Sequence, residues 1–425
     1  ANMYRTGEGV ARNWNTSIRW QQRLCAARQK QWALQQTEET FAAYAGALWN
    51  LSDSYFALAK PALAQGIWEK ELLPLCDKGA QLDFFNGLPY AASGYLKLGE
   101  LCQAQGNPED AQMWYCKAVE WFEALSKSIP GFRPFLAHTM SQLAGLYIDG
   151  QDLEMAQHWA DESMKLFQAL KDDEMTVNTR LFFAENCRRQ GAICMEKGAL
   201  DAARCWYEKG LEAVLALSGE SRSAETRQSV ANFYSRLGGL CLKGHDLAGA
   251  RRWYEAYLAL VQTLEAENSS SADHHALANA YYNLGELCLA EDDLAAARHW
   301  YEASLSVTRE LVQASGANKD RQDLADTCSQ LGDLCRRQDD LHSARRYLEE
   351  ACTIYEALAS ETNLPQMWDH LGIRLFKLAT LSDIDTTLLR RSLAIWEQLA
   401  EDHPDIVRYN QYRDILHKML DQTQG

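Results

Sequence analysis

The sequence predicts an all-α protein, built as a solenoid of antiparallel helix hairpins. Two columns of alanine recur in one register along most of the chain, and a conspicuous Leu-Gly pair lies between them. Each column advances by 47 residues at every step except one of 45. Two columns with one period indicate a repeat array, which can exceed the size of a single compact core. The first column is Ala45, Ala92, Ala137, Ala184, Ala231, Ala278 and Ala325, and the second is Ala64, Ala111, Ala156, Ala203, Ala250, Ala297 and Ala344.

Each repeat has the pattern of two amphipathic helices. The repeat that starts at Ala278 places Leu284 and Cys288 on one face of a first helix, at the i, i+3 and i+7 spacing of a buried stripe. An acidic turn follows, in which Asp293 precedes the second helix as an N-cap, as Asp246 and Asp340 do in neighbouring repeats. We expect the glycine and the alanines to permit close approach of the two helices.

The pattern resembles the tetratricopeptide repeat. Its elements are an aromatic residue, Leu-Gly three and four residues later, a core residue, an alanine and a second aromatic, as in Tyr281, Leu284–Gly285, Cys288, Ala297 and Tyr301. The resemblance covers roughly residues 30–400 and implies a right-handed superhelix whose first helices line a concave groove. The repeats are longer than the family's basic unit of about 34 residues, as in similar bacterial tetratricopeptide proteins. We therefore expect longer helices and longer loops between repeats.

Both ends depart from the repeat. Residues 1–27 resemble the second half of a Sel1-like repeat, because Tyr4, Gly7, Gly9, Val10 and Trp20 match that pattern. Half a unit would leave one face of the solenoid uncovered, so we expect this chain to be cut from a longer polypeptide. A native start with an improvised cap is the alternative. Residues 28–400 are expected to form about eight helical hairpins, and residues 401–425 a C-terminal capping helix.

Composition narrows the classes of function. The net charge is −16 and the pI about 5.1, which disfavours nucleic acid because an acidic surface repels phosphate. There is no run of 18 apolar residues, so we expect no membrane span. The twelve cysteines contain no Cys-x-x-Cys motif, and five of them share one repeat position, which indicates core packing and a reducing, cytoplasmic location. These five are Cys102, Cys194, Cys241, Cys288 and Cys335.

No pattern of catalytic or cofactor-binding residues is present. We find no phosphate-binding loop, no nucleophile elbow and no zinc-protease motif, so we expect no enzyme, no cofactor and no metal. The Asp273–His274–His275 triplet is a weak metal candidate in an expected inter-repeat loop. A tryptophan column in the second helices could stack ligands, but we interpret it as packing against neighbouring helices. Its members are Trp114, Trp159, Trp206, Trp253 and Trp300.

Polar columns on the first helices provide the candidate binding site. Amide and guanidinium groups spaced along a groove suit an extended peptide backbone, which offers unpaired carbonyl groups along its length. Since the middle of the groove would be locally basic, it could prefer an acidic segment; a solvated polar face is the alternative. The candidate groove residues are Arg188, Arg189, Asn232, Arg236, Asn279, Asn283 and Gln330.

We therefore expect a cytoplasmic scaffold or adaptor that binds a protein or peptide segment in the concave groove. The alternative is a regulatory module that senses a small peptide or metabolite through a change in superhelix shape. Fold alone does not choose between these functions.

Overall fold

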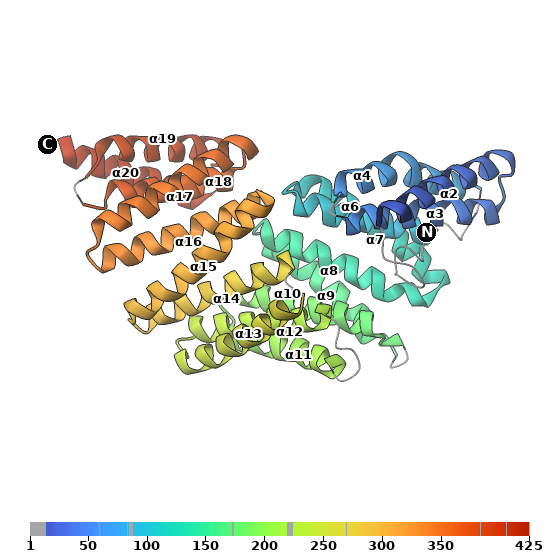
Figure 1. Ribbon diagram of the computed structural model, residues 1–425, viewed down its shortest axis with the longest axis horizontal. Coiled ribbons are helices and arrows are strands. Elements are labelled where there is room, and N and C mark those ends of the chain that lie inside the picture. Colours follow the sequence, from blue (N-terminus) through green and yellow to red (C-terminus); the bar gives the residue numbers. More distant parts are fainter. Residues whose placement is uncertain are drawn as a thin grey trace. The chain divides into compact units, whose positions relative to one another are not determined.

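The structure of the protein is a computed structural model (Figure 1). The structure describes residues 14–58, 60–82, 84, 88–171, 174–218, 224–268, 270–382, 384–404 and 406–424. Helices and turns make up this part of the chain, which contains no β-strand. The chain divides into two compact units, Ala1–Glu220 and Ser221–Gly425.

The first unit begins with a single helix and continues as hairpins. In its first hairpin, the second arm consists of two short α-helices separated by one π-helical turn, η1. A 3-10 turn, η3, joins two later hairpins. In chain order the elements are α2 (Trp14–Leu34), α3 (Glu38–Ala57), α4 (Pro61–Ile67), η1 (Trp68–Leu72), α5 (Leu73–Gln81), α6 (Leu88–Ala104), α7 (Pro108–Ser128), η3 (Pro130–Phe132), α8 (Arg133–Asp149), α9 (Leu153–Gln168), α10 (Val177–Glu196) and α11 (Leu200–Ser218).

The second unit is a run of four hairpins followed by one terminal helix. Its elements are α12 (Ala224–Lys243), α13 (Leu247–Asn268), α14 (Ser271–Ala290), α15 (Leu294–Ser315), α16 (Asn318–Arg337), α17 (Leu341–Thr362), α18 (Pro365–Ala379), α19 (Thr386–Asp402) and α20 (Val407–Gln424). Consecutive helices pack on one another throughout each unit. In the described residues this gives eight hairpins between α3 and α19, which confirms the predicted all-α solenoid of hairpins.

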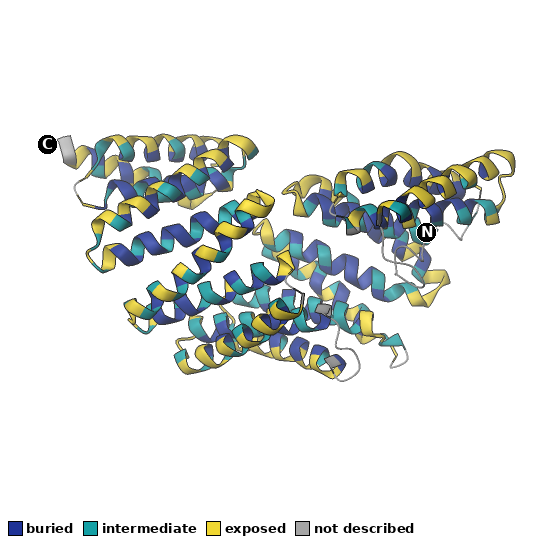
Figure 2. Cartoon of the chain, viewed as in Figure 1, coloured by how far each residue is buried: buried dark blue, intermediate teal, exposed yellow. Residues whose placement is uncertain are grey.

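The alanine columns lie in the core. All fourteen members are buried, and thirteen of them have no measurable exposed surface, Ala278 being 5 % exposed. Figure 2 shows the buried side of each helix turned toward its neighbours. Alanine fits these positions because a larger side chain would separate helices that pack at a distance of about 8–10 Å.

In five hairpins a glycine of the first helix receives an aromatic ring from the second helix, whereas Gly332 faces the side chain of Leu348. A Cβ atom on Gly285 would lie 2.7 Å from the ring of Tyr301, and one on Gly191 would lie 2.3 Å from Tyr207. The same contact joins Gly99 to Tyr115 and Gly238 to Tyr254; in the last hairpin Gly372 faces Trp396. Each of these rings is nearly or fully buried. The glycine therefore provides the space that the ring fills, and this contact permits the predicted close approach of the two helices.

Most of the described hairpin turns contain one left-handed residue, which in several hairpins directly precedes the residue that caps the second helix. His245 and Asp292 have φ angles of 60° and 62°, and Gly198 has 74°. The Asp293 side chain then accepts a hydrogen bond from the backbone N–H of Ala296 at 3.0 Å, which satisfies a donor at the start of α15. The predicted aspartate caps are thus confirmed: Asp246 caps Gly249 at 2.9 Å and Asp340 caps Ser343 at 3.1 Å.

The cysteines are free and mostly buried. Burial raises the pKa of both Cys187 and Cys328 to about 12, so these thiols stay protonated at neutral pH. The shared repeat position of five cysteines predicted that they pack in the core. The burial of most of them as free thiols is consistent with this prediction.

The two expected terminal segments differ from the structure in their bounds. Helix α2 is continuous from Trp14 to Leu34, so the structure has no break at the expected boundary between residues 27 and 28. Residues 1–13, which contain most of the expected Sel1-like motif, lie outside the described residues. At the other end α20 packs on α19 and buries Tyr409, Leu416 and Leu420.

Two adjacent glycines in α12 allow the ring contact to be tested. A Cβ atom on Gly238 would lie 2.4 Å from the Tyr254 ring, whereas one on Gly239 would lie 3.6 Å from the nearest atom, an ordinary contact. We predict that Gly238→Ala destabilises the protein by about 1–3 kcal/mol relative to Gly239→Ala, because only the first substitution overpacks the hairpin. Both gain the same helix propensity. Urea unfolding followed by circular dichroism measures the difference, and equal midpoints would contradict the proposed contact.

Candidate functional site

The candidate site in the second unit lies on the first helices of its hairpins, α12, α14, α16 and α18. We call the polar side of these helices the first-helix face, defined by Asn232, Ser235, Asn279, Asn283, Asp326, Gln330, Arg374 and Lys377. Hydrogen bonds join each of these helices to the next. The face is therefore one continuous surface within this unit.

A hydrogen-bond ladder of fixed register runs between successive first helices. Asn283 donates to the hydroxyl of Ser235 at 3.1 Å, and Gln330 donates to the hydroxyl of Tyr282 at 3.0 Å. These pairs are both 48 residues apart. In each pair, the amide donates to a hydroxyl of the preceding repeat. The hydroxyl belongs to the residue just before the position that is equivalent to the amide residue. The amides of Asn283 and Gln330 thus hold neighbouring repeats in register.

The first unit has the same rung with an arginine. Arg189 on α10 donates to the hydroxyl of Ser141 at 2.7 Å and to the amide oxygen of Gln142 at 2.6 Å, both on α8. Its side chain is only 7 % exposed. A Cβ atom on residue 145 would lie 2.6 Å from Arg189 Nε, so Gly145 makes room for the guanidinium group. Arg189 is therefore an interior residue, whose Nη donors are used within the protein.

One carboxylate neutralises much of the positive charge predicted here. Glu185 accepts hydrogen bonds from Arg188 Nε at 2.8 Å and Arg188 Nη2 at 2.6 Å, and Arg189 Nη2 lies 2.9 Å away. Burial by itself would raise the pKa of Glu185, but the two guanidinium groups lower it to about 2. His138, stacked on Phe182 at 4.0 Å, lies in the same cluster, and burial lowers its pKa.

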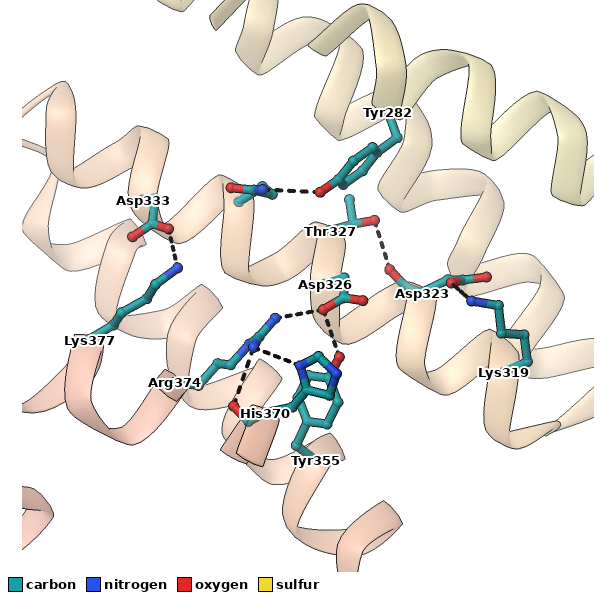
Figure 3. Close-up of polar contacts among 11 residues, drawn as sticks. Tyr282, Lys319, Asp323, Asp326, Thr327, Asp333, Tyr355, His370, Arg374 and Lys377 are labelled. Atoms are coloured by element: carbon teal, nitrogen blue, oxygen red, sulfur yellow. Dashed lines mark hydrogen bonds and ion pairs between the residues drawn. The ribbon is translucent and has the colours of Figure 1, made fainter. Parts of the chain in front are cut away.

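A second charge network occupies the far end of the first-helix face (Figure 3). Arg374 on α18 and the hydroxyl of Tyr355 on α17 both bond Oδ1 of Asp326 on α16, each at 2.6 Å. Arg374 also contacts Nδ1 of His370 at 3.1 Å, and His370 stacks on Tyr355. Lys377 bonds Asp333 at 2.5 Å. These ion pairs connect α16 to α18, and burial raises the pKa of neighbouring Asp323.

The seven predicted groove residues therefore have different surroundings. Arg188 and Arg189 belong to the first unit, and both pair with Glu185. Asn283 and Gln330 are partly buried members of the ladder. Asn232 and Asn279 are exposed on the first-helix face, and Arg236 is exposed next to Ser235 on α12. Asn279 and Asn232 occupy equivalent positions in successive repeats, and Asn279 Oδ1 accepts a hydrogen bond from Asn283 at 3.0 Å.

Sequence reasoning missed the partners that make these networks. Arg374 and Lys377 were not singled out, although complementary residues at a separation of about one repeat provide a signal. Asp326 and Arg374 are 48 residues apart, and Asp333 and Lys377 are 44 apart. Asp326 and Arg374 keep the 48-residue separation of the ladder, whereas the separation of Asp333 and Lys377 departs from it, so a search at a fixed 47-residue period finds neither pair.

The other candidate chemistries have structural roles. The described residues contain no group of three His, Cys, Asp or Glu side chains that could hold a metal ion. The triplet at residue 273 was expected in a loop; instead it lies in the first turn of α14, where Asp273 completes a capping box with Ser270. Trp114 and Trp300 stack on Tyr95 and Tyr281, each at 5.7 Å, as expected for packing. No helix in the described part is long and apolar enough to cross a membrane.

Comparison with family models identifies the repeat. Two models described as tetratricopeptide repeat match three segments, residues 324–362 for one model and residues 92–124 and 278–310 for the other. The last two segments begin at first-column alanines. Together with the hairpin architecture, these matches show that the chain is a tetratricopeptide-type repeat protein, and so has the fold of a protein-interaction scaffold. Comparison with curated proteins gives no match.

Several solved structures are similar to this chain at low sequence identity. A Rap protein crystallised in complex with competence and sporulation factor matches with a TM-score of 0.50 and 11 % identity, over 91 % of this chain and 98 % of that chain. BtubC (BKLC) from P. vanneervenii matches with a TM-score of 0.46 and 22 % identity, over 59 % of this chain and 92 % of that chain. A signal-transduction ATPase (STAND) protein with a tetratricopeptide repeat sensor, from Pyrococcus horikoshii, matches with a TM-score of 0.41 and 13 % identity. The match covers 89 % of this chain and 55 % of that chain.

The Glu185 cluster predicts a dependence of stability on acid. Because its pKa is lowered to about 2 from an ordinary value of 4.5, Glu185 contributes stability above pH 4.5 that is lost as the pH falls toward 2. We predict that Glu185→Gln removes roughly 2–3 kcal/mol at pH 7 and much less at pH 2.5. Denaturant unfolding at both values measures this effect. The exposed Glu196→Gln on the same helix is the control, and an equal pH dependence in both variants would refute the assignment.

Proposed function

We propose that this protein is an interaction scaffold that holds an extended polypeptide segment along the first-helix face of its second unit. The observation that supports the proposal is the pair of exposed amides, Asn232 and Asn279, at equivalent positions of successive repeats. We infer that this face lines the concave groove that the tetratricopeptide resemblance implies.

The chemistry of the two amides suits a peptide backbone. Each side chain has a carbonyl oxygen that accepts and an NH₂ group that donates, which are the complements of a peptide group. In Asn279, the oxygen accepts from Asn283 within the protein, and this contact orients the NH₂ group for a peptide carbonyl. Packed helices generally lie about 8–10 Å apart, and an extended chain advances about 3.3 Å per residue, so first helices at such a spacing would contact every third residue of the peptide.

The ladder supports this arrangement because it keeps the amides at a constant spacing. The bonds from Asn283 to Ser235 and from Gln330 to Tyr282 fix three consecutive first helices before a partner arrives. Groups that are already ordered lose little conformational entropy on binding. We do not propose a preference for an acidic segment. Glu185 already pairs with Arg188 and Arg189, and α16 adds the negative charges of Asp323, Asp326 and Asp333.

The expected compartment follows from the thiols. We propose a reducing, cytoplasmic setting, because the cysteines are free and most of them are buried in the helix packing. The likeness to the Rap protein concerns the fold, and that protein's complex with competence and sporulation factor is one instance of such a fold with a bound factor.

A selection from a random-peptide library against the full chain tests the proposal. We predict that peptides enriched by the wild-type chain bind the double variant Asn232→Ala/Asn279→Ala about tenfold more weakly or worse, because two backbone hydrogen bonds worth about 1 kcal/mol each are lost. Fluorescence anisotropy measures the affinities.

The matched control is Gln262→Ala/Gln313→Ala, which removes two exposed amides from the second helices α13 and α15. It should leave the affinities unchanged. An equal loss in the control, or an unchanged affinity in the first-helix variant, would show that this face is not the binding site. Compaction in solution scattering with a small peptide, and no enriched extended sequence, would favour the sensing function instead.

A further inference from the structure

Helix α2 has two apolar faces, and only one of them is covered within the described part of the chain. Ile18, Gln21, Cys25 and Trp32 are buried where α2 packs on α3. On the opposite side Trp20 is 49 % exposed, Leu24 43 % and Leu34 84 %, and Ala27 is also exposed. Positions 20, 24, 27, 31 and 34 alternate steps of four and three, which is the spacing of a helix–helix seam. We call Trp20, Leu24, Ala27 and Leu34 the α2 stripe.

This concentration of exposed apolar side chains is specific to α2. Among the described residues, α2 has three large exposed apolar side chains, and no other helix has more than two. Isolated exposed apolar residues are ordinary, whereas a continuous row indicates an interaction surface. The row from residue 20 to residue 34 is about 21 Å long, which is two heptads of a partner helix. Figure 2 shows how much of α2 is exposed.

The charge of α2 is opposite to that of the whole protein. The helix contains Arg19, Arg23, Arg28 and Lys30 and no aspartate or glutamate, in a chain whose net charge is −16. At about 100° per residue, Arg19, Arg23 and Lys30 follow one edge of the α2 stripe and Arg28 lies along the other. The structure gives none of the four an ion pair with a described residue. Arg23 instead lies over the Trp20 ring at 5.1 Å, and Arg28 donates to Gln31 at 2.8 Å.

These charges identify the kind of partner. Two copies of α2 cannot pair well with each other, because basic residues would face basic residues along the seam in either orientation. An anionic membrane is also disfavoured, because the stripe is narrow, Gln31 interrupts it, and it has only three large apolar side chains that could enter lipid. A helix with apolar residues at the same spacing and carboxylates at its edges complements both the shape and the charge of this surface.

We propose that the α2 stripe is a docking site for an acidic amphipathic helix of a partner polypeptide. The α2 stripe shares no residue with the first-helix face, because α2 belongs to the first unit and the first-helix face to the second. It would add a second interaction surface to the scaffold. This surface would select its partner by charge, whereas the first-helix face binds through asparagine side chains.

Two synthetic helices test the proposal on the full chain. Both carry leucine at the seam positions; the acidic probe has glutamate at the flanking positions, and the basic probe has lysine there. We predict that the acidic probe binds at least about tenfold more tightly than the basic one, with an affinity that falls as salt rises. Leu24→Glu should weaken the acidic probe about tenfold or more. Arg19→Glu/Arg23→Glu leaves two acidic and two basic residues along the stripe and should abolish the preference between the probes.

The control is Val407→Glu, which charges an apolar side chain that is 66 % exposed on α20. It should leave binding unchanged, as should Asn232→Ala/Asn279→Ala, so this proposal and the proposed function can fail separately. Circular dichroism establishes that each variant is folded. Equal binding of the two probes, an equal loss in the Val407 variant, or an unchanged preference after the charge reversal would overturn the proposal. So would a wild-type dimer in sedimentation, or binding to phosphatidylserine vesicles, that Leu24→Glu abolishes.

Discussion

The close contact between a glycine of the first helix and a buried ring of the second helix is the constraint on which the repeats depend. With a Cβ atom 2.3–2.7 Å from the ring in the hairpins of Gly99, Gly191, Gly238 and Gly285, no larger residue fits without moving a helix. The buried alanines of both columns keep the same short separation on either side of this contact. Because interiors are close-packed, a helix pair held at this distance stacks against the next pair in one arrangement, and the solenoid follows.

Polar groups then determine how one hairpin sits against the next within a unit. The bonds from Arg189 to Ser141, from Asn283 to Ser235 and from Gln330 to Tyr282 repeat one geometry, in which a long side chain bonds a hydroxyl of the preceding repeat. In the last repeats, an ion pair between Arg374 and Asp326 performs the same role. A buried donor without a partner is costly, so each rung favours its own register over a displaced one.

The consequence for binding is that the same polar columns contain structural and exposed groups. Asn283 and Gln330 use amide donors within the ladder, whereas Asn232 and Asn279 keep exposed amides above it. Helix α2 has a different surface chemistry, because its exposed stripe is apolar and the residues along the edges of the stripe are basic. A chain with a large negative charge thus carries two surfaces of unlike chemistry. A neutral row of amides suits a peptide backbone, and a basic seam suits an acidic helix.

The sequence alone determined the hairpins, the alanine and glycine contacts and the aspartate caps, because these depend on local spacing that recurs every 47 residues. It also indicated correctly that the cysteines and tryptophans are packing residues. Tertiary structure decided which polar residues are available. Arg189 and Arg236 occupy equivalent positions of one polar column, yet Arg189 is buried beside Gly145 and Arg236 is exposed. A repeat pattern gives the face of a helix, but the reach of a long side chain to a neighbouring helix depends on how the helices pack, and no spacing along the chain specifies that distance.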